Sequence, residues 1–279
     1  MSNVLGFSCV ENHVLDEMKN RCENIGLLYF DCFMSLNDIY VCSCESSFEY
    51  FSGVHRIQDI LKENGMLKIE LYRNSFDDFI KIIEKNNTDT IVLMLLNKEE
   101  TKKMFFARGL REDHYVLAGL VNDGYYLSND IPSKKILVDK SKLKQLYIPN
   151  YLVFEFLPFY EKTSLQNLCS QRKYFFKNNP SNLDLSIIHK ENFLITFRNA
   201  LVIYKTMRER MHEYLSALSY DIDLSDEISE ISKAIAYAEY MRLRKVCDIE
   251  KYNELVLKAN KIERKIFNKV VERYGTGNK

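Results

Sequence analysis

The sequence predicts an α+β protein in which a mixed first part is followed by an all-α helical module. Short apolar runs separated by turn signals recur through the first 160 residues, as in a protein with several strands. Residues 181–274 contain neither Gly nor Pro, and their apolar residues recur at helical spacing. We therefore expect two domains, one over residues 1–160 and one over residues 161–279.

The composition excludes several classes of protein. The chain has 279 residues, with 39 Lys and Arg against 39 Asp and Glu, and this balance argues against a dedicated nucleic-acid-binding protein. No segment reaches the ~18 apolar residues that a membrane span needs, and the start MSNVLGFSCV lacks the basic and apolar parts of a secretory signal. The 7 Cys are an odd number, so we expect mostly reduced thiols and a cytoplasmic protein.

The first helix is predicted over residues 9–24. Ser8 is its expected N-cap, Glu11 is an early acidic residue that suits the helix dipole, and Gly26 is the expected C-terminal cap. The apolar stripe of this helix repeats every four residues, at Val10, Val14, Met18 and Cys22.

Strands and short helices are expected next along the chain. Asn122-Asp-Gly is a hairpin signal that joins two of the strands. Short helices should begin near Ser75 and near Asp139, and the first of them should end near Lys85. The expected strands are Leu67–Tyr72, Ile91–Leu96, Tyr115–Val121, Tyr125–Ser128, Ile136–Val138 and Tyr151–Leu157.

Three long helices are expected after Pro180. Ser225 is the expected N-cap of the second helix, and Gly275 closes the third. Long amphipathic helices suit either of two roles here, a cap that shapes access to a site or a homodimer interface. The expected bounds are Glu191–Leu218, Ser225–Val246 and Asp248–Tyr274.

Cys9 is the candidate nucleophile. It opens the first predicted helix, where the positive end of the helix dipole favours the thiolate, and the thiolate is the reactive form of a Cys. The alternative is a small buried Cys on the apolar side of the helix, although Cys9 lies one residue off the apolar stripe.

His114 and Asp130 are the candidate base and its partner. His114 starts one strand of the predicted hairpin and Asp130 follows the other, and the chain folds back between them at Asn122–Gly124. Antiparallel pairing would bring them side by side, with the carboxylate placed to orient the imidazole and stabilise its charged form. The alternative is a His at a strand edge and an Asp that caps the loop before Pro132.

Together, Cys9, His114 and Asp130 resemble the pattern of papain-like cysteine peptidases, in particular the bacteriocin-leader peptidase branch. In that branch a Cys opens the first helix, and a His-led strand, a hairpin and an acid follow, much as in HYVLAGLVNDGYYLSND here. The resemblance implies a papain-like catalytic domain over residues 1–160. It also implies an oxyanion-hole amide six residues before the Cys, which is a Gln in the branch and Asn3 in this chain.

The opening Cys9-Val-Glu-Asn-His-Val-Leu and the helical second half resemble more closely the butirosin-type (BtrH-like) acyltransferases. Members of this family take an acyl group from a carrier-protein thioester and place it on an amine, and a related type forms the amide bonds of closthioamide-type polythioamides. The resemblance implies an amide-forming enzyme of natural-product biosynthesis with an acyl-Cys9 intermediate. Its implied partners are an acyl or peptidyl carrier protein, which bears the phosphopantetheine, and a small amine.

Other residues leave alternatives open. His13 lies four residues after Cys9 on the same helix face, so it competes with His114 as the base, or could join Cys9 in a metal site. Cys42-Ser-Cys44 could add ligands, but this is not a zinc-knuckle spacing and no second Cys/His pair follows nearby. We therefore expect free thiols, with no metal and no cofactor of the chain's own.

A basic segment follows the hairpin. Residues 125–180 hold nine basic and four acidic side chains, a local charge of +5. Carrier proteins are typically acidic, so we expect Lys140, Lys142 and Lys144 to form a docking surface near the entrance to the thiol. The alternative is a solvated basic loop.

The sequence thus favours an amide-forming cysteine acyltransferase with a Cys9–His114–Asp130 triad. Two alternatives stay open. One is a cysteine peptidase or amidase that uses the same triad with water as the acceptor. The other is a non-catalytic papain-like binding module.

Overall fold

The computed structural model divides the chain into two compact units, and each is described by itself. The first unit comprises Met1–Arg21 and Arg56–Tyr160, and the second comprises Cys22–His55 and Glu161–Lys279. The structure describes residues 6–22, 24–29, 32–45, 56–85, 88–107, 112–122, 124–130, 133–157 and 182–274.

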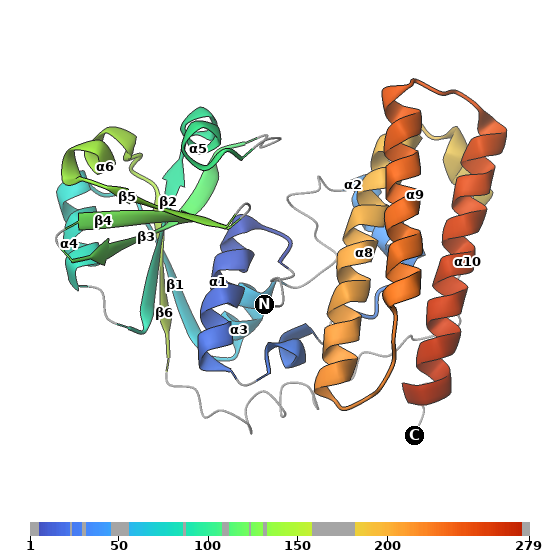
Figure 1. The fold of residues 1–279 in the computed structure, drawn as a ribbon, viewed down its shortest axis with the longest axis horizontal. Coiled ribbons are helices and arrows are strands. Elements are labelled where there is room, and N and C mark those ends of the chain that lie inside the picture. The colour runs from blue at the N-terminus through green and yellow to red at the C-terminus, as the bar shows by residue number, and fades with distance from the viewer. Residues whose placement is uncertain are drawn as a thin grey trace. The chain divides into compact units, whose positions relative to one another are not determined.

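A six-stranded antiparallel sheet forms the core of the first unit (Figure 1). Its strands are β1 (Leu67–Tyr72), β2 (Thr90–Leu96), β3 (His114–Val121), β4 (Gly124–Asn129), β5 (Lys134–Val138) and β6 (Tyr151–Phe156). They lie in the order β1-β6-β2-β3-β4-β5. β2 lies inside the sheet, which explains why Val92, Leu93 and Met94 are all fully buried. The six predicted strands and the α+β class are confirmed.

Helices cover both faces of this sheet. On one face, α4 (Phe76–Lys85), α5 (Lys98–Phe105) and α6 (Lys140–Leu146) contribute to one hydrophobic core. On the other face lie α1 (Cys9–Arg21), packed on β3, and α3 (Ile57–Glu63), packed on β1 (Figure 1). The buried residues of α4 follow the helical period, with side chains at Phe76, Phe79, Ile80 and Ile83.

The start of α1 is fixed by a buried carboxylate. Ser8 caps the helix as predicted, because its Oγ accepts the N–H of Glu11 at 3.1 Å. Glu11 is fully buried, and its carboxylate accepts the N–H of Phe7 just before the helix and the N–H of Ile57 at the start of α3 (2.9 Å). This arrangement extends the capping box, since one side chain both fixes the entry of the chain into α1 and joins α1 to α3.

The second unit is helical. Its elements are η1 (Ile25–Tyr29), α2 (Leu36–Glu45), η3 (Leu185–His189), α8 (Phe193–Ala217), α9 (Ser225–Leu243) and α10 (Ile249–Tyr274). α8 contacts η1, α2, η3 and α9, and α9 also contacts α10. The three long helices are confirmed, but the N-cap prediction at Ser225 is wrong: Ser225 is the first helical residue, and the Asp223 carboxylate accepts its N–H at 2.9 Å. Gly275 lies outside the described residues.

Residues 22–55 belong to the second unit, although the sequence predicted one domain over residues 1–160. The physical reason is burial, since η1 and α2 pack on α8 through apolar side chains. Gly26, the predicted cap of α1, lies in η1 instead, where the Glu213 carbonyl of α8 comes so close that a Cβ would overlap it. α1 itself ends at Arg21. The buried apolar residues of this segment include Leu28, Leu36, Ile39 and Tyr40.

A buried ion pair ties this segment to the helices after residue 190. Arg208 of α8 is fully buried and donates to the carbonyls of Cys32 (3.0 Å) and Met34. Its guanidinium lies 3.7 Å from the carboxylate of Glu263 of α10, which also accepts the N–H of Leu36 at the start of α2. A buried charge is tolerated when it is paired and hydrogen-bonded, and here the same pair also satisfies backbone groups of residues 32–36.

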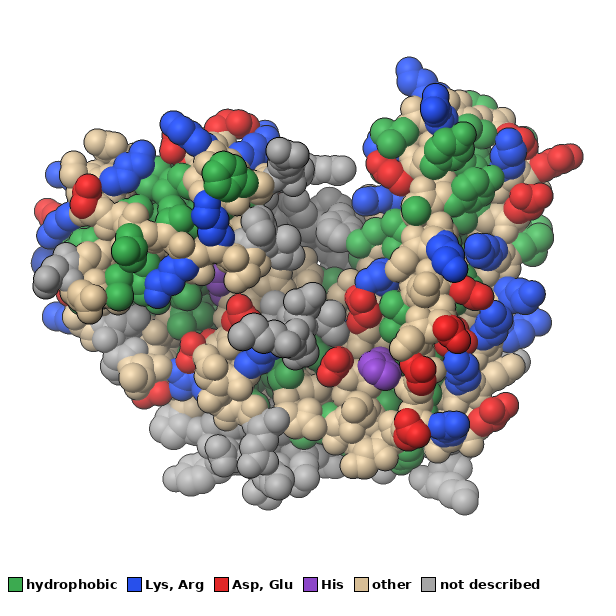
Figure 2. Space-filling view, viewed as in Figure 1, with side chains coloured by type: hydrophobic (Ala, Val, Ile, Leu, Met, Phe, Trp, Pro, Cys, Tyr) green, Lys and Arg blue, Asp and Glu red, His purple; other side chains and the backbone are tan. Residues whose placement is uncertain are grey.

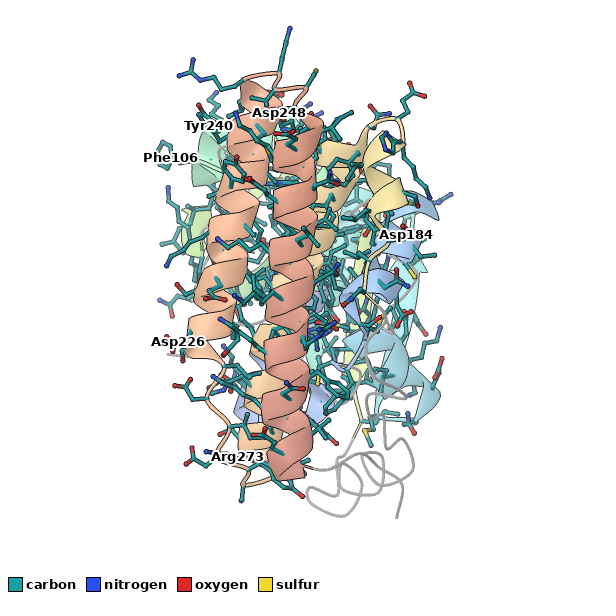
Figure 3. The ribbon with its side chains drawn as sticks, turned by 90° about the vertical axis from the view of Figure 1, so that its right-hand side faces the viewer. Phe106, Asp184, Asp226, Tyr240, Asp248 and Arg273 are labelled. Carbon is teal, nitrogen blue, oxygen red and sulfur yellow. The ribbon has the colours of Figure 1, made fainter. Side chains whose placement is uncertain are left out.

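The outer surface of α9 and α10 is mixed in character. Asp226 and Arg273 lie at one end of this antiparallel helix pair, and Tyr240 and Asp248 lie at the other (Figure 3). Figure 2 shows charged side chains of both signs interspersed over this unit, with hydrophobic side chains gathered toward its upper end. Across the described ranges, no helix has both the length and the apolar character to cross a membrane.

Replacing Arg208 with Met should destabilise the second unit by about 3–5 kcal/mol, because Glu263 would keep a buried charge without its cation. Hydrogen exchange of α8 peptides under increasing urea measures this loss. The matched control is Arg242→Met. Arg242 pairs with Glu239 at the surface, where the two side chains are 38% and 32% exposed, and its loss should cost less than about 1 kcal/mol. Equal losses in the two variants would contradict the structural role of Arg208.

Candidate active site

The thiol of Cys9 lies at the first turn of α1. The N–H groups of this turn have no partner within the helix and carry the positive end of the helix dipole, so an anion is favoured beside them. The side chain is only partly buried, and Cys9 forms no disulfide. This Cys is therefore placed at the positive end of a helix, where a substrate could approach it.

The β3–β4 hairpin brings His114 and Asp130 together. Its register pairs Leu117 with Ser128 and Val121 with Gly124, so the first residue of β3 and the residue after β4 meet at the end away from the turn. There, the Nε2 atom of His114 lies 2.7 Å from the Oδ1 atom of Asp130. Both side chains are largely buried, with 14% and 3% of their surfaces exposed. The juxtaposition predicted from the hairpin signal is present in the structure.

Cys9 and His114 are also within hydrogen-bonding reach of each other. Because Nε2 of the imidazole faces Asp130, the Nδ1 atom is the one available to the thiol. This order of the two nitrogens is the reverse of that in Ser-His-Asp proteases, where Nδ1 faces the acid. Sulfur, imidazole and carboxylate form a continuous row contributed by one helix and one hairpin.

The charges of this row support one another. Burial lowers the pKa of His114, but hydrogen bonds to Asp130 and Cys9 and the charges of both outweigh burial and raise it to about 10. Burial raises the pKa of Asp130, but hydrogen bonds from His114 and Asn12 outweigh this and lower it to about 2. Near neutral pH the imidazole is therefore cationic and the carboxylate anionic, so a cation lies beside the sulfur of Cys9.

Asn12 belongs to the same cluster, although its sequence context predicts no role for it in the site. Its Nδ2 donates to the Oδ2 atom of Asp130 at 2.8 Å, and its Oδ1 accepts the N–H of Gly6 at 3.0 Å. The side chain is 4% exposed. The only available signal was its position one turn after Cys9, which is not distinctive for an Asn in a helix.

His13 is the second histidine near the row, and it is not the one that contacts the thiol. It is buried on α1, its imidazole is hydrogen-bonded to the backbone of Tyr115, and its Nε2 has no hydrogen-bond partner among the described residues. Burial lowers the pKa of His13 despite the nearby charge of Asp130. His13 is therefore neutral where His114 is cationic, and the structure favours His114 over His13 as the group that serves Cys9.

The three lysines predicted to bind a carrier protein do not lie beside this row. β5 pairs Lys134 with Asn129 at the triad end of the hairpin and Val138 with Tyr125 near its turn, so β5 leads the chain away from the row before α6 begins. α6 also packs on the face of the sheet opposite α1 (Figure 1). Lys140, Lys142 and Lys144 therefore belong to a helix on the other face of the sheet, and their role in docking a carrier protein stays a prediction.

Two further predictions concern an oxyanion donor and a metal. Asn3 lies outside the described residues. Cys42 and Cys44 are reduced thiols of α2. In the part of the chain that the structure describes, no group of three or more His, Cys, Asp or Glu side chains could hold a metal ion.

Comparison of the sequence with protein-family models and with curated proteins gave no match. The chemistry of the row Cys9–His114–Asp130 is therefore the basis for assigning a function.

In Asp130→Asn, we expect the pKa of His114 to fall well below about 10, because burial would then lower it with less opposition. Since the folded-state pKa of His114 lies above its ordinary value of 6.5, its ionic contribution to stability is complete below pH 6.5 and is lost as the pH rises toward about 10. The stability difference between wild type and variant should therefore be larger near pH 6 than near pH 10. Nuclear magnetic resonance titration of His114 and urea unfolding at both pH values measure these effects.

The control is Asp113→Asn. Asp113 is the exposed residue before His114, and its Oδ1 accepts the N–H of Lys98 at 2.9 Å, a bond that an Asn preserves. This variant should leave the His114 titration close to that of wild type. A wild-type titration in Asp130→Asn as well would show that the carboxylate does not hold the imidazole.

Proposed function

We propose that this protein is a cysteine acyltransferase that forms an amide from a thioester through an acyl-Cys9 intermediate. The observation that carries the proposal is the row of Cys9, His114 and Asp130, with the imidazole 2.7 Å from the carboxylate and within reach of the thiol. A nucleophile, a base and a group that orients the base are the requirements for acyl transfer by covalent catalysis.

Acylation of Cys9 is the first proposed step. The thiolate attacks the thioester carbonyl of the donor, and the bond between that carbonyl and the donor sulfur breaks. The departing sulfur takes the proton from the His114 imidazolium and leaves as a thiol. The Cys9 N–H at the start of α1 is the proposed first donor to the oxyanion, and the Asn3 amide is the proposed second donor.

Transfer to the amine is the second proposed step. Acylation removes the negative charge of Cys9, which is one of the causes that raise the pKa of His114, so the neutral imidazole becomes easier to populate. The amine attacks the acyl-Cys9 carbonyl, its proton passes to His114, and the carbon–sulfur bond breaks to restore the thiolate beside the imidazolium. An amide is more stable than a thioester, so the sum of the two steps needs no ATP.

A papain-like fold and a carrier-protein donor are parts of the same proposal. The helix that opens with Cys9 packs against an antiparallel sheet whose β3 begins with His114, and this supports the resemblance drawn from the sequence. The expected donor is an acyl or peptidyl group on the phosphopantetheine of a carrier protein, and the expected acceptor is a small amine. The second candidate function is hydrolysis by the same row, with water in place of the amine.

Incubation with an acyl-pantetheine should add the mass of the acyl group to the intact protein, and Cys9→Ala should abolish this adduct. Adding a diamine to the acylated wild type should then release an amide rather than a free acid. Intact-mass spectrometry and product analysis measure the two steps. Cys44→Ala is the matched control, because Cys44 is an exposed thiol of the second unit.

Each outcome of this experiment selects one function. An adduct that depends on Cys9 and yields an amide supports the acyltransferase. An adduct that yields only free acid supports a peptidase or amidase. An adduct retained in Cys9→Ala, or the lack of any adduct with several acyl donors, would contradict both and favour a binding module.

Carrier docking on α6 has its own test. Reversing Lys140, Lys142 and Lys144 to Glu should raise KM for a carrier-bound donor and leave KM for an acyl-pantetheine unchanged, because only the carrier protein would meet this surface. The measurement is steady-state acyl transfer with each donor at two salt concentrations. An unchanged KM for the carrier-bound donor would exclude this surface.

A further inference from the structure

We propose that Asn12 is a positioning residue that holds Asp130, and through it His114, in register with the nucleophile carried by the same helix. The proposal rests on the proposed function in one respect, which is that the row it organises is the catalytic one. It adds a role for Asn12 that the resemblance to known families does not assign.

Asn12 and His114 bind different oxygens of the same carboxylate. His114 faces Oδ1 of Asp130 at 2.7 Å, and Asn12 donates to Oδ2 at 2.8 Å. A carboxylate that is held by one donor alone can rotate about its last torsion and carry its partner with it. Two donors on two oxygens remove this freedom, and the 3% exposure of Asp130 leaves little room for water to replace either donor.

The Asn12 amide is itself held in one orientation. Its Oδ1 accepts the N–H of Gly6 at 3.0 Å, on the side opposite the bond to Asp130. A flipped amide would place its NH2 group against the Gly6 N–H and its oxygen against the carboxylate, so both contacts would become repulsive. Gly6 has no side chain to disturb this arrangement, whereas a Cβ at this position would overlap the Asn12 amide.

The position of Asn12 relative to Cys9 is set by helix geometry. The two residues are three apart on α1, so their backbones are held about one turn from each other. The hydrogen bond from Asn12 therefore places Asp130, which comes from the hairpin, at a fixed distance from the thiol, which comes from the helix. It does so without touching the reacting atoms.

The pKa of Asp130 depends on the ionisable groups and the hydrogen-bond donors that surround its carboxylate. His114 acts on Asp130 through its charge, and Asp130, His114 and Asp16 act in turn on the buried His13. The hydrogen bond from Asn12 is one of the causes that keep the pKa of Asp130 low. Without it the carboxylate would be a weaker and less ordered partner for His114, and the imidazolium beside Cys9 would be less stable.

Alkylation of Cys9 tests this role without assuming any substrate. In Asn12→Ala the rate of reaction of Cys9 with iodoacetamide at pH 6 should fall by between about 10-fold and 100-fold. The difference from wild type should shrink near pH 10, where His114 of the wild type also loses its charge. Peptide mass spectrometry reports each thiol separately. Cys22, Cys44 and Cys247 serve as internal references in the same samples.

Two further variants separate positioning from general stability. Asn12→Asp keeps an acceptor for Gly6 but sets a second carboxylate against Asp130, so it should slow Cys9 at least as much as Asn12→Ala does. Asn20→Ala removes an exposed Asn from the same helix and should leave Cys9 at the wild-type rate. A rise in the reactivity of the other thiols in Asn12→Ala would instead show loss of the fold and would contradict a specific role.

The result is independent of whether acyl transfer occurs. If Asn12→Ala and Asn12→Asp keep the wild-type pH profile of Cys9, the positioning role is overturned even when the wild type transfers acyl groups. If the wild type transfers none but the profile depends on Asn12, the proposed function fails and the positioning role stands. If the wild type transfers acyl groups and the pH profile of Cys9 also depends on Asn12, the rate of acylation should fall together with the rate of alkylation in the Asn12 variants.

Discussion

The carboxylate of Asp130 is the interaction on which the rest of the site depends. It lies after β4, binds the imidazole at the start of β3, and is bound in turn by an amide of α1. A sheet and a helix can slide against each other at small cost when only apolar side chains meet, because the hydrophobic effect has no preferred direction. A buried carboxylate with a separate donor on each oxygen does have a preferred direction, so it fixes the geometry in which α1 packs on β3.

A buried carboxylate that joins separate helices occurs in both units of the molecule. Glu11 receives the N–H groups of Phe7 and Ile57, and so joins the start of α1 to the start of α3. Glu263 lies beside Arg208 and receives the N–H of Leu36, and so joins α10 to α8 and α2. Burying each of these carboxylates is costly unless every oxygen finds a donor, so each one specifies where its donors must be.

Much of this architecture could be predicted from the sequence, and the exceptions have physical causes. The hairpin signal Asn122-Asp-Gly fixes the register of β3 and β4, and the register alone brings His114 to Asp130. α5 was not predicted because its sequence KEETKKMF buries only Thr101 and Phe105 and shows no apolar stripe. Its helix depends instead on the Asn97 side chain, which accepts the N–H of Glu99.

Other features depend on contacts that no local pattern encodes. The role of Asn12 depends on the carboxylate of Asp130, which lies 118 residues away in the sequence and is brought to Asn12 by the hairpin. The lysines of α6 follow the hairpin closely in the sequence, but β5 carries the chain from the Asp130 end of the hairpin toward its turn before α6 begins.

The interrupted first unit has a consequence for synthesis on the ribosome. Residues 22–55 emerge after α1, yet the groups that bury and bind them, Arg208 and Glu263, emerge much later. The carboxylate that accepts the N–H of Leu36 lies 227 residues further along the chain. The sheet can close once β6 has been made, so the first unit can form around a long unfolded insertion. Synthesis from the N-terminus therefore leaves the apolar faces of η1 and α2 uncovered until α8, the helix on which they pack, has been made, and exposed apolar surface of this kind favours aggregation.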